Sequence, residues 1–268
     1  MPPKLLLTAI FVTLYAFSGE HYARVEPWER VTLKAAAAGT ILEAAASLEG
    51  KTVADARIIH IDDRIDRKEL ESARRSRELI ARTLELTRKM IPGLKESWKR
   101  QEGYYRRMKK LTTASQTQKD QAYQAMVGAE NQYLSTQEKA LNLEKTLLDL
   151  DYKIAMLEDR ISKKNIRLKN RYLYKLMVRK GEYASMGMPL AIVDDLSRGK
   201  LVLYLSPEEI RALKQRKAKI FIGGERSEAA FSKIWKETDE KYISSYRAEL
   251  PVPSGKYPFS SLVKVEIR

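Results

Sequence analysis

The sequence predicts a multi-domain α+β protein in which a long helical hairpin separates two β-rich halves. Three observations carry this prediction. A seven-residue apolar repeat covers residues 122–161, a weaker copy of it covers residues 70–108, and strand-like runs punctuated by glycine lie on either side. An apolar repeat held over more than about three heptads is typical of a coiled coil rather than of a globular surface helix.

The repeat is clearest in the second arm, residues 116–164. Ten of its twelve positions are plainly apolar, and the twelve are Ala122, Met126, Ala129, Tyr133, Thr136, Ala140, Leu143, Leu147, Leu150, Ile154, Leu157 and Ile161. The short polar stretch 111–118 separates this arm from the first, so each seam finds its nearest partner in the other arm folded back antiparallel. Arms of roughly 50 residues reach roughly 75 Å, which predicts a spacer with a tip.

One feature interrupts the first arm, the dipeptide Pro92-Gly93. Proline lacks the N–H that a helix interior needs and its ring clashes with the preceding turn. We expect a kink or a break there, although Ile91, Leu94 and Trp98 keep the heptad phase across it.

The N-terminal segment, residues 1–22, contains an uncharged run at 5–17. As a helix it would span about 20 Å, less than the roughly 30 Å of a bilayer core. This length suits a signal peptide, with Ala16 to Ser18 as a cleavage region, or an uncleaved anchor completed by Ser18 and Gly19. Both interpretations predict export of the rest of the chain. In the third interpretation, residues 5–17 form a buried helix of a soluble protein.

The β-rich parts are expected at residues 30–62, 165–198 and 199–268, with the hairpin at 63–164 between the first two. Glycines divide short strand-like runs in both halves that flank the hairpin. In the last part Ser206, Pro207 and Glu209 form a capping-box helix start between strand-like runs.

Composition excludes several kinds of site. The chain has no cysteine, and its two histidines are His21 and His60. His60 lies beside Asp62 and Asp63, but we expect an ordinary strand-end residue there and no metal site. No nucleophile with a base and no phosphate-binding glycine loop can be assembled, so we expect no enzyme and no cofactor.

The formal net charge of +15 invites a nucleic-acid interpretation, but its distribution argues against one. Residues 63–111 hold sixteen Lys or Arg against eight Asp or Glu, and residues 116–164 hold seven against eight. The charges are scattered around the heptad and do not form a basic stripe with aromatic residues. We expect a solvated helical face, with residual basic charge available to acidic lipid or an acidic partner.

Both halves carry spacings that resemble a known family. Gly39-x-Ile41, Gly50-x-x-Val53 and Ile59-x-Ile61-Asp62 resemble the first lipoyl half-motif of the HlyD-like periplasmic adaptor (membrane fusion protein) family. The run Val178-x-x-Gly181-x-x-Ala184-x-x-Gly187-x-Pro189 is similar to its second half. The resemblance implies a split lipoyl-like barrel-sandwich hybrid that holds the hairpin, followed by a small β-barrel domain. The family's usual Ala-Pro and glycine turn is replaced by residues 168–172, where Asn170 can supply the left-handed conformation.

The resemblance implies a function in the periplasm, at the inner membrane of a Gram-negative-type envelope. Such an adaptor bridges an inner-membrane transporter to an outer-membrane channel of an export or efflux system, is membrane-associated, and assembles into a ring-like homo-oligomer. The alternative is an envelope coiled-coil tether or scaffold without a transport role. A biotinyl or lipoyl carrier is disfavoured because the chain has Asp62-Asp63-Arg64 where a carrier presents its lysine.

Candidate docking residues lie at the expected tip. The family's docking tips resemble Arg-x-x-x-Leu followed seven residues later by Ser and five beyond by Asp. Alignment on Ser115 and Asp120 places Met108 at the leucine, whereas Arg107-x-x-x-Leu111 has the right internal spacing. The candidate set for partner docking is Arg106, Arg107, Met108, Leu111, Ser115 and Asp120.

Overall fold

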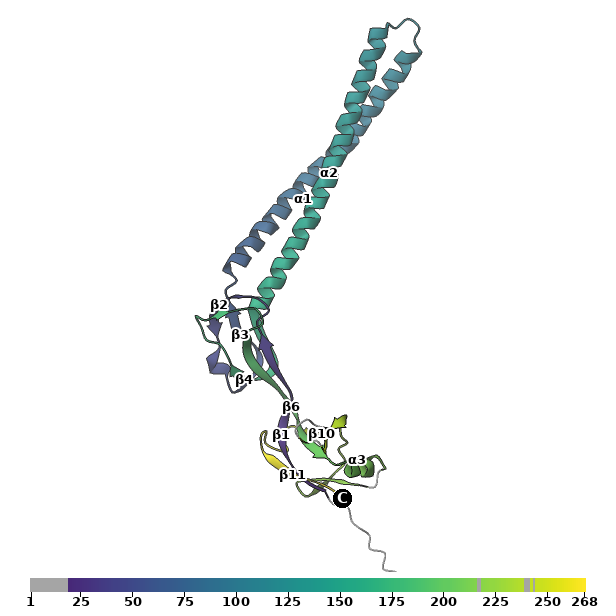
Figure 1. Cartoon of the computed structure of the whole chain (residues 1–268). Helices are drawn as coiled ribbons and strands as arrows, with labels where there is room; N and C mark the ends of the chain where they lie inside the picture. Colours follow the sequence, from purple (N-terminus) through teal and green to yellow (C-terminus); the bar gives the residue numbers. More distant parts are fainter. Residues whose placement is uncertain (1–18, 216–217, 239–241, 243) are drawn as a thin grey trace, which may run out of the picture.

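The structure is a computed structural model that describes residues 19–215, 218–238, 242 and 244–268. A hairpin of two long helices projects from two small β bodies that follow one another end to end (Figure 1). The predicted α+β class is confirmed. Most of the predicted anchor or signal segment, residues 1–22, lies outside the described residues, because description begins at residue 19.

The hairpin consists of α1 (Arg64–Lys110) and α2 (Gln116–Lys164). The two helices pack along each other and cross near the middle of the hairpin (Figure 1). Their buried apolar positions, Ala73 and Leu84 on α1 and Ala122, Tyr133, Ala140 and Leu157 on α2, all fall on the predicted heptad. The apolar repeat therefore forms the contact between the arms.

Pro92 does not break α1, which is one continuous helix. Its side chain is exposed and borders a hollow that Leu84 and Leu147 also line. At such an exposed turn, water can bind the backbone carbonyl that loses its N–H partner. The helix continues past Pro92, in agreement with the heptad phase that Ile91, Leu94 and Trp98 keep across it.

The upper β body holds the base of the hairpin. It contains β2 (Gly39–Ala44), a short 3-10 turn η1 (Ala46–Leu48), β3 (Lys51–Ile61), β4 (Asn165–Leu176) and β5 (Tyr183–Ala184). β2 pairs with β3 and β5, and β3 pairs with β4 across the whole helical insertion. Its core combines side chains from both sides of the insertion, among them Ile41, Ile59, Ile61, Leu173 and Leu190.

Asn170 lies in β4 with φ of 50°, the left-handed conformation expected for it. A side chain with a short polar group adopts this region at lower cost than other non-glycine residues. The glycine of the family pattern is therefore replaced here without loss of the strand.

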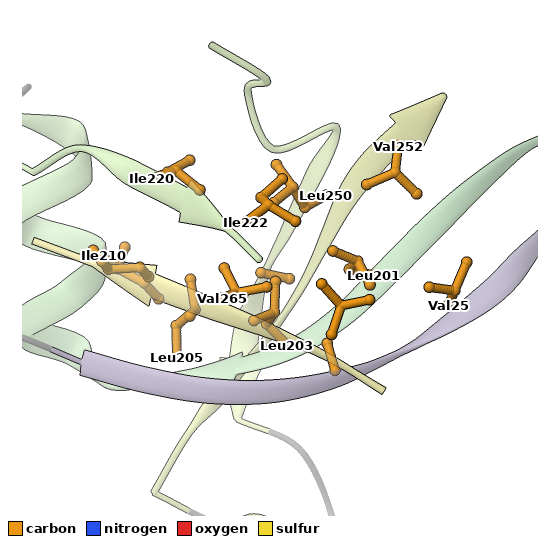
Figure 2. Packing of buried hydrophobic residues seen from close by; sticks show 14 residues of the cluster. Val25, Leu201, Leu203, Leu205, Ile210, Ile220, Ile222, Leu250, Val252 and Val265 are labelled. Atoms are coloured by element: carbon orange, nitrogen blue, oxygen red, sulfur yellow. The ribbon is translucent and has the colours of Figure 1, made fainter. Parts of the chain in front are cut away.

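The lower β body is built on β1 (Gly19–Lys34) and β6 (Pro189–Leu205). It also contains α3 (Pro207–Lys214), β7 (Ile220–Ile222), β8 (Glu225–Ser227), β9 (Lys233–Thr238), β10 (Tyr246–Pro253) and β11 (Leu262–Ile267). Figure 2 shows Val25, Leu201, Leu203, Leu205 and Val265 converging in its core, with Ile210 of α3 at one side. The predicted capping box at the start of α3 is present, since Ser206 and Glu209 each accept a backbone N–H of the other.

β1 and β6 belong to both bodies. β1 pairs with β11 over Gly19–Arg24 and with β6 over Val25–Lys34, and β6 continues to β10 below and β4 above. The boundary expected between residues 198 and 199 thus falls inside β6, and residues 19–22 of the expected N-terminal segment lie in β1. The strand continues through the expected domain boundary, because a ladder of backbone hydrogen bonds can continue wherever neighbouring strands stay in register.

Side chains brace this shared ladder. Arg30 donates two hydrogen bonds of 2.8 Å to the buried carboxylate of Asp194 on β6. The Arg198 guanidinium lies 3.6 Å from the centre of the Trp28 ring, at the bulge between Pro27 and Glu29. Bidentate and stacked arginine contacts hold a fixed geometry, so they stiffen the joint between the bodies.

Cleavage of the hairpin at its tip should leave the two halves of the chain associated. A protease site placed at residues 112–114 separates β1–β3 from β4–β11, which still share four ladders and both hydrophobic cores. Because each core draws side chains from both fragments, separation would expose apolar surface on both of them. We expect the cut chain to elute as one particle in gel filtration and to separate only in denaturant; halves that separate in plain buffer would contradict the shared core.

Candidate functional site

The tip of the hairpin is a short turn closed by helix caps. α1 ends at Lys110, where the N–H of Leu111 donates to the carbonyl of Met108 at 3.2 Å, and α2 begins after Ser115. Ser115 accepts the Gln118 N–H at 3.3 Å, and the Gln118 side chain accepts the Ser115 N–H at 3.0 Å. Ser115 is therefore the N-cap of α2, and this role alone explains a serine at the position.

The structure brings the candidate docking residues to one end of the molecule, with unequal exposure. Arg106, Arg107, Leu111, Ser115 and Asp120 are exposed, and Met108 is half-buried. Two of the polar side chains are engaged on their own helix, since Arg106 bonds Glu102 at 2.6 Å and Asp120 accepts from Gln116 at 2.8 Å. Arg107 has no ion pair among the described residues, and Leu111 is exposed in the turn.

Aromatic pairs fix the end of the hairpin below the tip. Tyr105 and Tyr123 lie with ring centres 5.3 Å apart, and Trp98 stacks on Tyr133 at 5.6 Å with an interplanar angle of 9°. Each pair joins α1 to α2. Large rings in offset contact contribute more than their buried area, so the tip is held by two stiff layers.

Each helix also carries an apolar stripe that does not face the other helix. On α2 the stripe comprises Leu134, Leu141 and Leu148, spaced by seven residues and 50%, 65% and 70% exposed. On α1 it comprises Leu79, Leu86 and Met90, 58%, 63% and 56% exposed. A second heptad series in the sequence, 134, 141 and 148, was the signal that would have found the α2 stripe.

The two stripes lie on opposite sides of the hairpin. One side is crossed by ion pairs from Arg74 to Glu158 and from Arg88 to Glu144. Leu148 lies one helical turn after Glu144, so the α2 stripe is on this side. The other side is crossed by the pair from Glu69 to Lys153. Thr83 lies two heptads after Glu69 and therefore on the same side as the Glu69–Lys153 pair. Leu79 and Leu86 lie one turn before and after Thr83, so the α1 stripe is on this side.

The base of the hairpin is fixed by a buried cluster around Asp63 and Asp66, which are 1% and 7% exposed. Asp63 accepts hydrogen bonds from Arg67 and Asn165 at 2.8 Å and contacts the His60 ring nitrogen at 3.1 Å. Asp66 accepts from Lys164 at 2.6 Å and pairs with Arg160 at 3.3 Å. The cluster joins β3 and the first turn of α1 to the last turn of α2.

The electrostatics of this cluster favour ionised carboxylates. Burial opposes ionisation of Asp63, but the hydrogen bonds from Arg67, Asn165 and His60 outweigh it and hold its pKa well below the usual range. The neighbouring Asp62 is partly exposed, and the hydrogen bond from Arg64 lowers its pKa to about 2. His60 is thus a hydrogen-bond partner at a strand end, as the sequence predicted.

Within residues 19–215, 218–238, 242 and 244–268, no group of three or more His, Cys, Asp or Glu side chains is placed to hold a metal ion. No helix in the described part of the chain has the length and apolar character to cross a membrane. The uncharged run at 5–17 precedes that part.

Comparison with solved structures finds the same architecture in other proteins. MacA from Actinobacillus actinomycetemcomitans is 12% identical, with a TM-score of 0.70 over 93% of this chain and 78% of that one. The membrane fusion protein Spr0693 from Streptococcus pneumoniae R6 is 10% identical, with a TM-score of 0.62 over 93% and 97% of the two chains. A putative efflux transporter from Bacteroides eggerthii is 10% identical, with a TM-score of 0.53 over 94% and 68%.

No protein-family model matches the sequence, and no curated protein matches it either. The likeness at these identities concerns the fold. For the fold, the resemblance to membrane fusion proteins expected from the glycine spacings and the hairpin is confirmed.

Replacement of Asp63 by asparagine should loosen the base of the hairpin. The change removes a charged acceptor that is itself buried and that serves three partners, two of them half-buried, which costs about 1 to 3 kcal/mol. Because the folded pKa of Asp63 is lowered, its contribution is complete above about pH 4 and fades as the pH falls further. Thermal melting should therefore separate wild type from Asp63→Asn at pH 7, and the separation should begin to narrow at pH 3.

The matched control is Asp62→Asn. Asp62 accepts from Arg64 at a partly exposed position, and surface pairs of this kind contribute little. Equal melting shifts for the two variants at pH 7 would show that the cluster around Asp63 does not hold the hairpin.

Proposed function

We propose that this protein is a periplasmic adaptor of an export or efflux system, which bridges an inner-membrane transporter to an outer-membrane channel. The observation that carries the proposal is a stiff two-helix spacer inserted into a β body, in an arrangement shared with the membrane fusion protein Spr0693 over nearly its whole length. A spacer of this kind has a use only if both of its ends are attached.

The proposal assigns a role to each part of the chain. The upper body, with expected ranges 30–62 and 165–198, is a split lipoyl-like barrel-sandwich hybrid that orients the coiled-coil hairpin, residues 63–164. The lower body, residues 199–268 together with the first half of β1, is a small β-barrel domain on the transporter side. Residues 5–17 direct the chain to the inner membrane, with the folded parts in the periplasm.

The tip is the proposed docking end for the channel. Arg107 and Leu111 are exposed there without a partner side chain on their own helix among the described residues, and the aromatic layers beneath keep them in a fixed position. Ser115 contributes by capping α2, so a change at Ser115 alters the turn as well as the surface. Arg106, Met108 and Asp120 shape the surface around the two contact residues.

The apolar stripes support a homo-oligomer. Leucines spaced by seven on an exposed helix face lose water contact only when another helix covers them. Since the α1 and α2 stripes lie on opposite sides, contact between the α1 stripe of one copy and the α2 stripe of the next is head-to-tail. Head-to-tail contacts form rings when the rotation closes, which fits the ring-like assembly proposed here.

Docking can be tested by the double change Arg107→Glu with Leu111→Glu, which leaves the Ser115 cap intact. We expect loss of export and of in-cell cross-linking from the tip to an outer-membrane protein, with unchanged amounts of folded adaptor in the envelope. Exposed changes of this kind usually move stability by less than about 0.5 kcal/mol.

The matched control for docking is Arg75→Glu, an exposed arginine of α1 far from the tip. Full export by the double variant would remove the tip from the docking role. It would favour a tether or scaffold without a conduit.

Self-association can be tested by Leu141→Glu with Leu148→Glu. Two charges in the α2 stripe oppose its burial against a second copy, so the detergent-solubilised chain should sediment as a smaller species. Ser135→Glu with Asn142→Glu adds the same charge on a neighbouring exposed face of α2 and should leave the assembly intact. A wild-type chain that stays monomeric at every concentration would contradict the homo-oligomer.

A further inference from the structure

The start of β1 lies directly against α3. The His21 ring nitrogen is 2.6 Å from Glu209 Oε1, and a Cβ added to Gly19 would lie 1.8 Å from the same oxygen. Residue 18 is bonded to Gly19, and the uncharged run ends at residue 17. The start of β1 and α3 therefore lie together at the end of the molecule opposite the hairpin tip (Figure 1).

Two hollows flank α3 and share Lys214 and Ile234 as lining residues. The first, about 550 Å³, lies between α3 and β9. The second, about 470 Å³, lies between α3, β7 and β8. Together they make one continuous surface around the helix, which we name the α3 surface.

The α3 surface carries several cations that have no acidic partner among the described residues. Arg211, Lys214, Lys219, Arg226 and Lys236 line the hollows, and none has an ion pair with a described residue. One acid, Glu228, lines the second hollow. Three other lysines of the same body do have acidic partners, namely Lys200 with Glu249, Lys256 with Glu225, and Lys264 with Glu20 and Glu266.

Aromatic and apolar side chains lie between these cations. Trp235 is 37% exposed at the first hollow, where its ring lies 4.9 Å from the Arg247 guanidinium. Phe231 lines the second hollow, and Tyr246 lines the first. Trp235 and Tyr246 each combine an apolar ring with one polar group, and such rings among long basic side chains suit the boundary between lipid headgroups and acyl chains.

We propose that the α3 surface binds the phosphate groups of anionic phospholipids in the membrane that residues 5–17 reach. The proposal rests on the proposed membrane association for the placement of the surface. Charge complementarity supplies the attraction to lipid, because cations without acidic partners are drawn to an anionic bilayer within about a Debye length. The lower body would then be held at a fixed tilt, with Trp235 at the headgroup level.

The experiment uses the full chain with Trp28→Phe and Trp98→Phe, so that Trp235 is the remaining tryptophan of the three. The chain is reconstituted into vesicles of phosphatidylcholine alone, or of phosphatidylcholine with phosphatidylglycerol, each with lipids carrying a quencher near the headgroup. We expect the emission of Trp235 to shift to shorter wavelength and to be quenched only in the vesicles with phosphatidylglycerol. High salt should reverse both effects.

The test variant is Arg211→Gln, Lys214→Gln and Lys236→Gln, and the matched control is Arg75→Gln, Lys95→Gln and Lys99→Gln on the exposed hairpin. The test variant should lose the shift and the quenching, and the control should keep them. Circular dichroism confirms that both are folded. Equal Trp235 emission in the two kinds of vesicle, or equal behaviour of the two variants, would overturn the proposal, as would the same shift with free inorganic phosphate or an acidic peptide alone.

Flotation of the unmodified chain separates this proposal from the proposed function. Flotation with neutral vesicles reports insertion of residues 5–17, whatever the α3 surface does. A chain that floats with neutral vesicles but shows no effect of phosphatidylglycerol remains a membrane-associated adaptor without this lipid site. A chain that floats with neither kind of vesicle overturns both the membrane association and the lipid site.

Discussion

The pairing of β3 with β4 is the constraint on which the rest of the structure depends. His60 and Asn165 are partners in this ladder although helices of 47 and 49 residues lie between them. The two strand ends fix the spacing of the helix ends, and the carboxylates of Asp63 and Asp66 then fix their direction through buried hydrogen bonds. A spacer on such a base transmits its orientation to the tip, because buried charged hydrogen bonds tolerate little displacement.

Much of this architecture could be predicted because local signals agreed with the global fold. The heptads at Leu84 and Leu157 identified the seam, Ser206 and Glu209 identified the start of α3, and Asn170 took the backbone conformation that replaced a glycine. In each case a short stretch carries its own physical preference. When local preferences agree with the global fold in this way, the fold can be predicted from a single sequence.

The parts that could not be predicted depend on long-range pairing or on exposure. The continuity of β6 through both bodies follows from its partners β1, β4 and β10, which are far away in the sequence. The leucines at 134, 141 and 148 form a second heptad series in the sequence, but only the fold shows that the other arm leaves this face of α2 exposed. Likewise, the cations around α3 stand out only once their neighbours in space are known. At the tip, Ser115 matched a docking pattern, but its hydrogen bonds make it first a helix cap.

The surfaces left open by this fold differ in chemistry along its length. The tip offers an arginine and a leucine on a stiff turn, the flanks of the hairpin offer leucine stripes, and the opposite end offers unpaired cations among aromatic rings. Each suits a different kind of neighbour, in turn a protein surface, another helix and an anionic layer. Since these surfaces are separate in the fold, occupation of one leaves the others free. Under the proposed function, a different chemistry at each contact keeps the partners apart along the length of the chain, because a neighbour suited to one surface has no complement at the next.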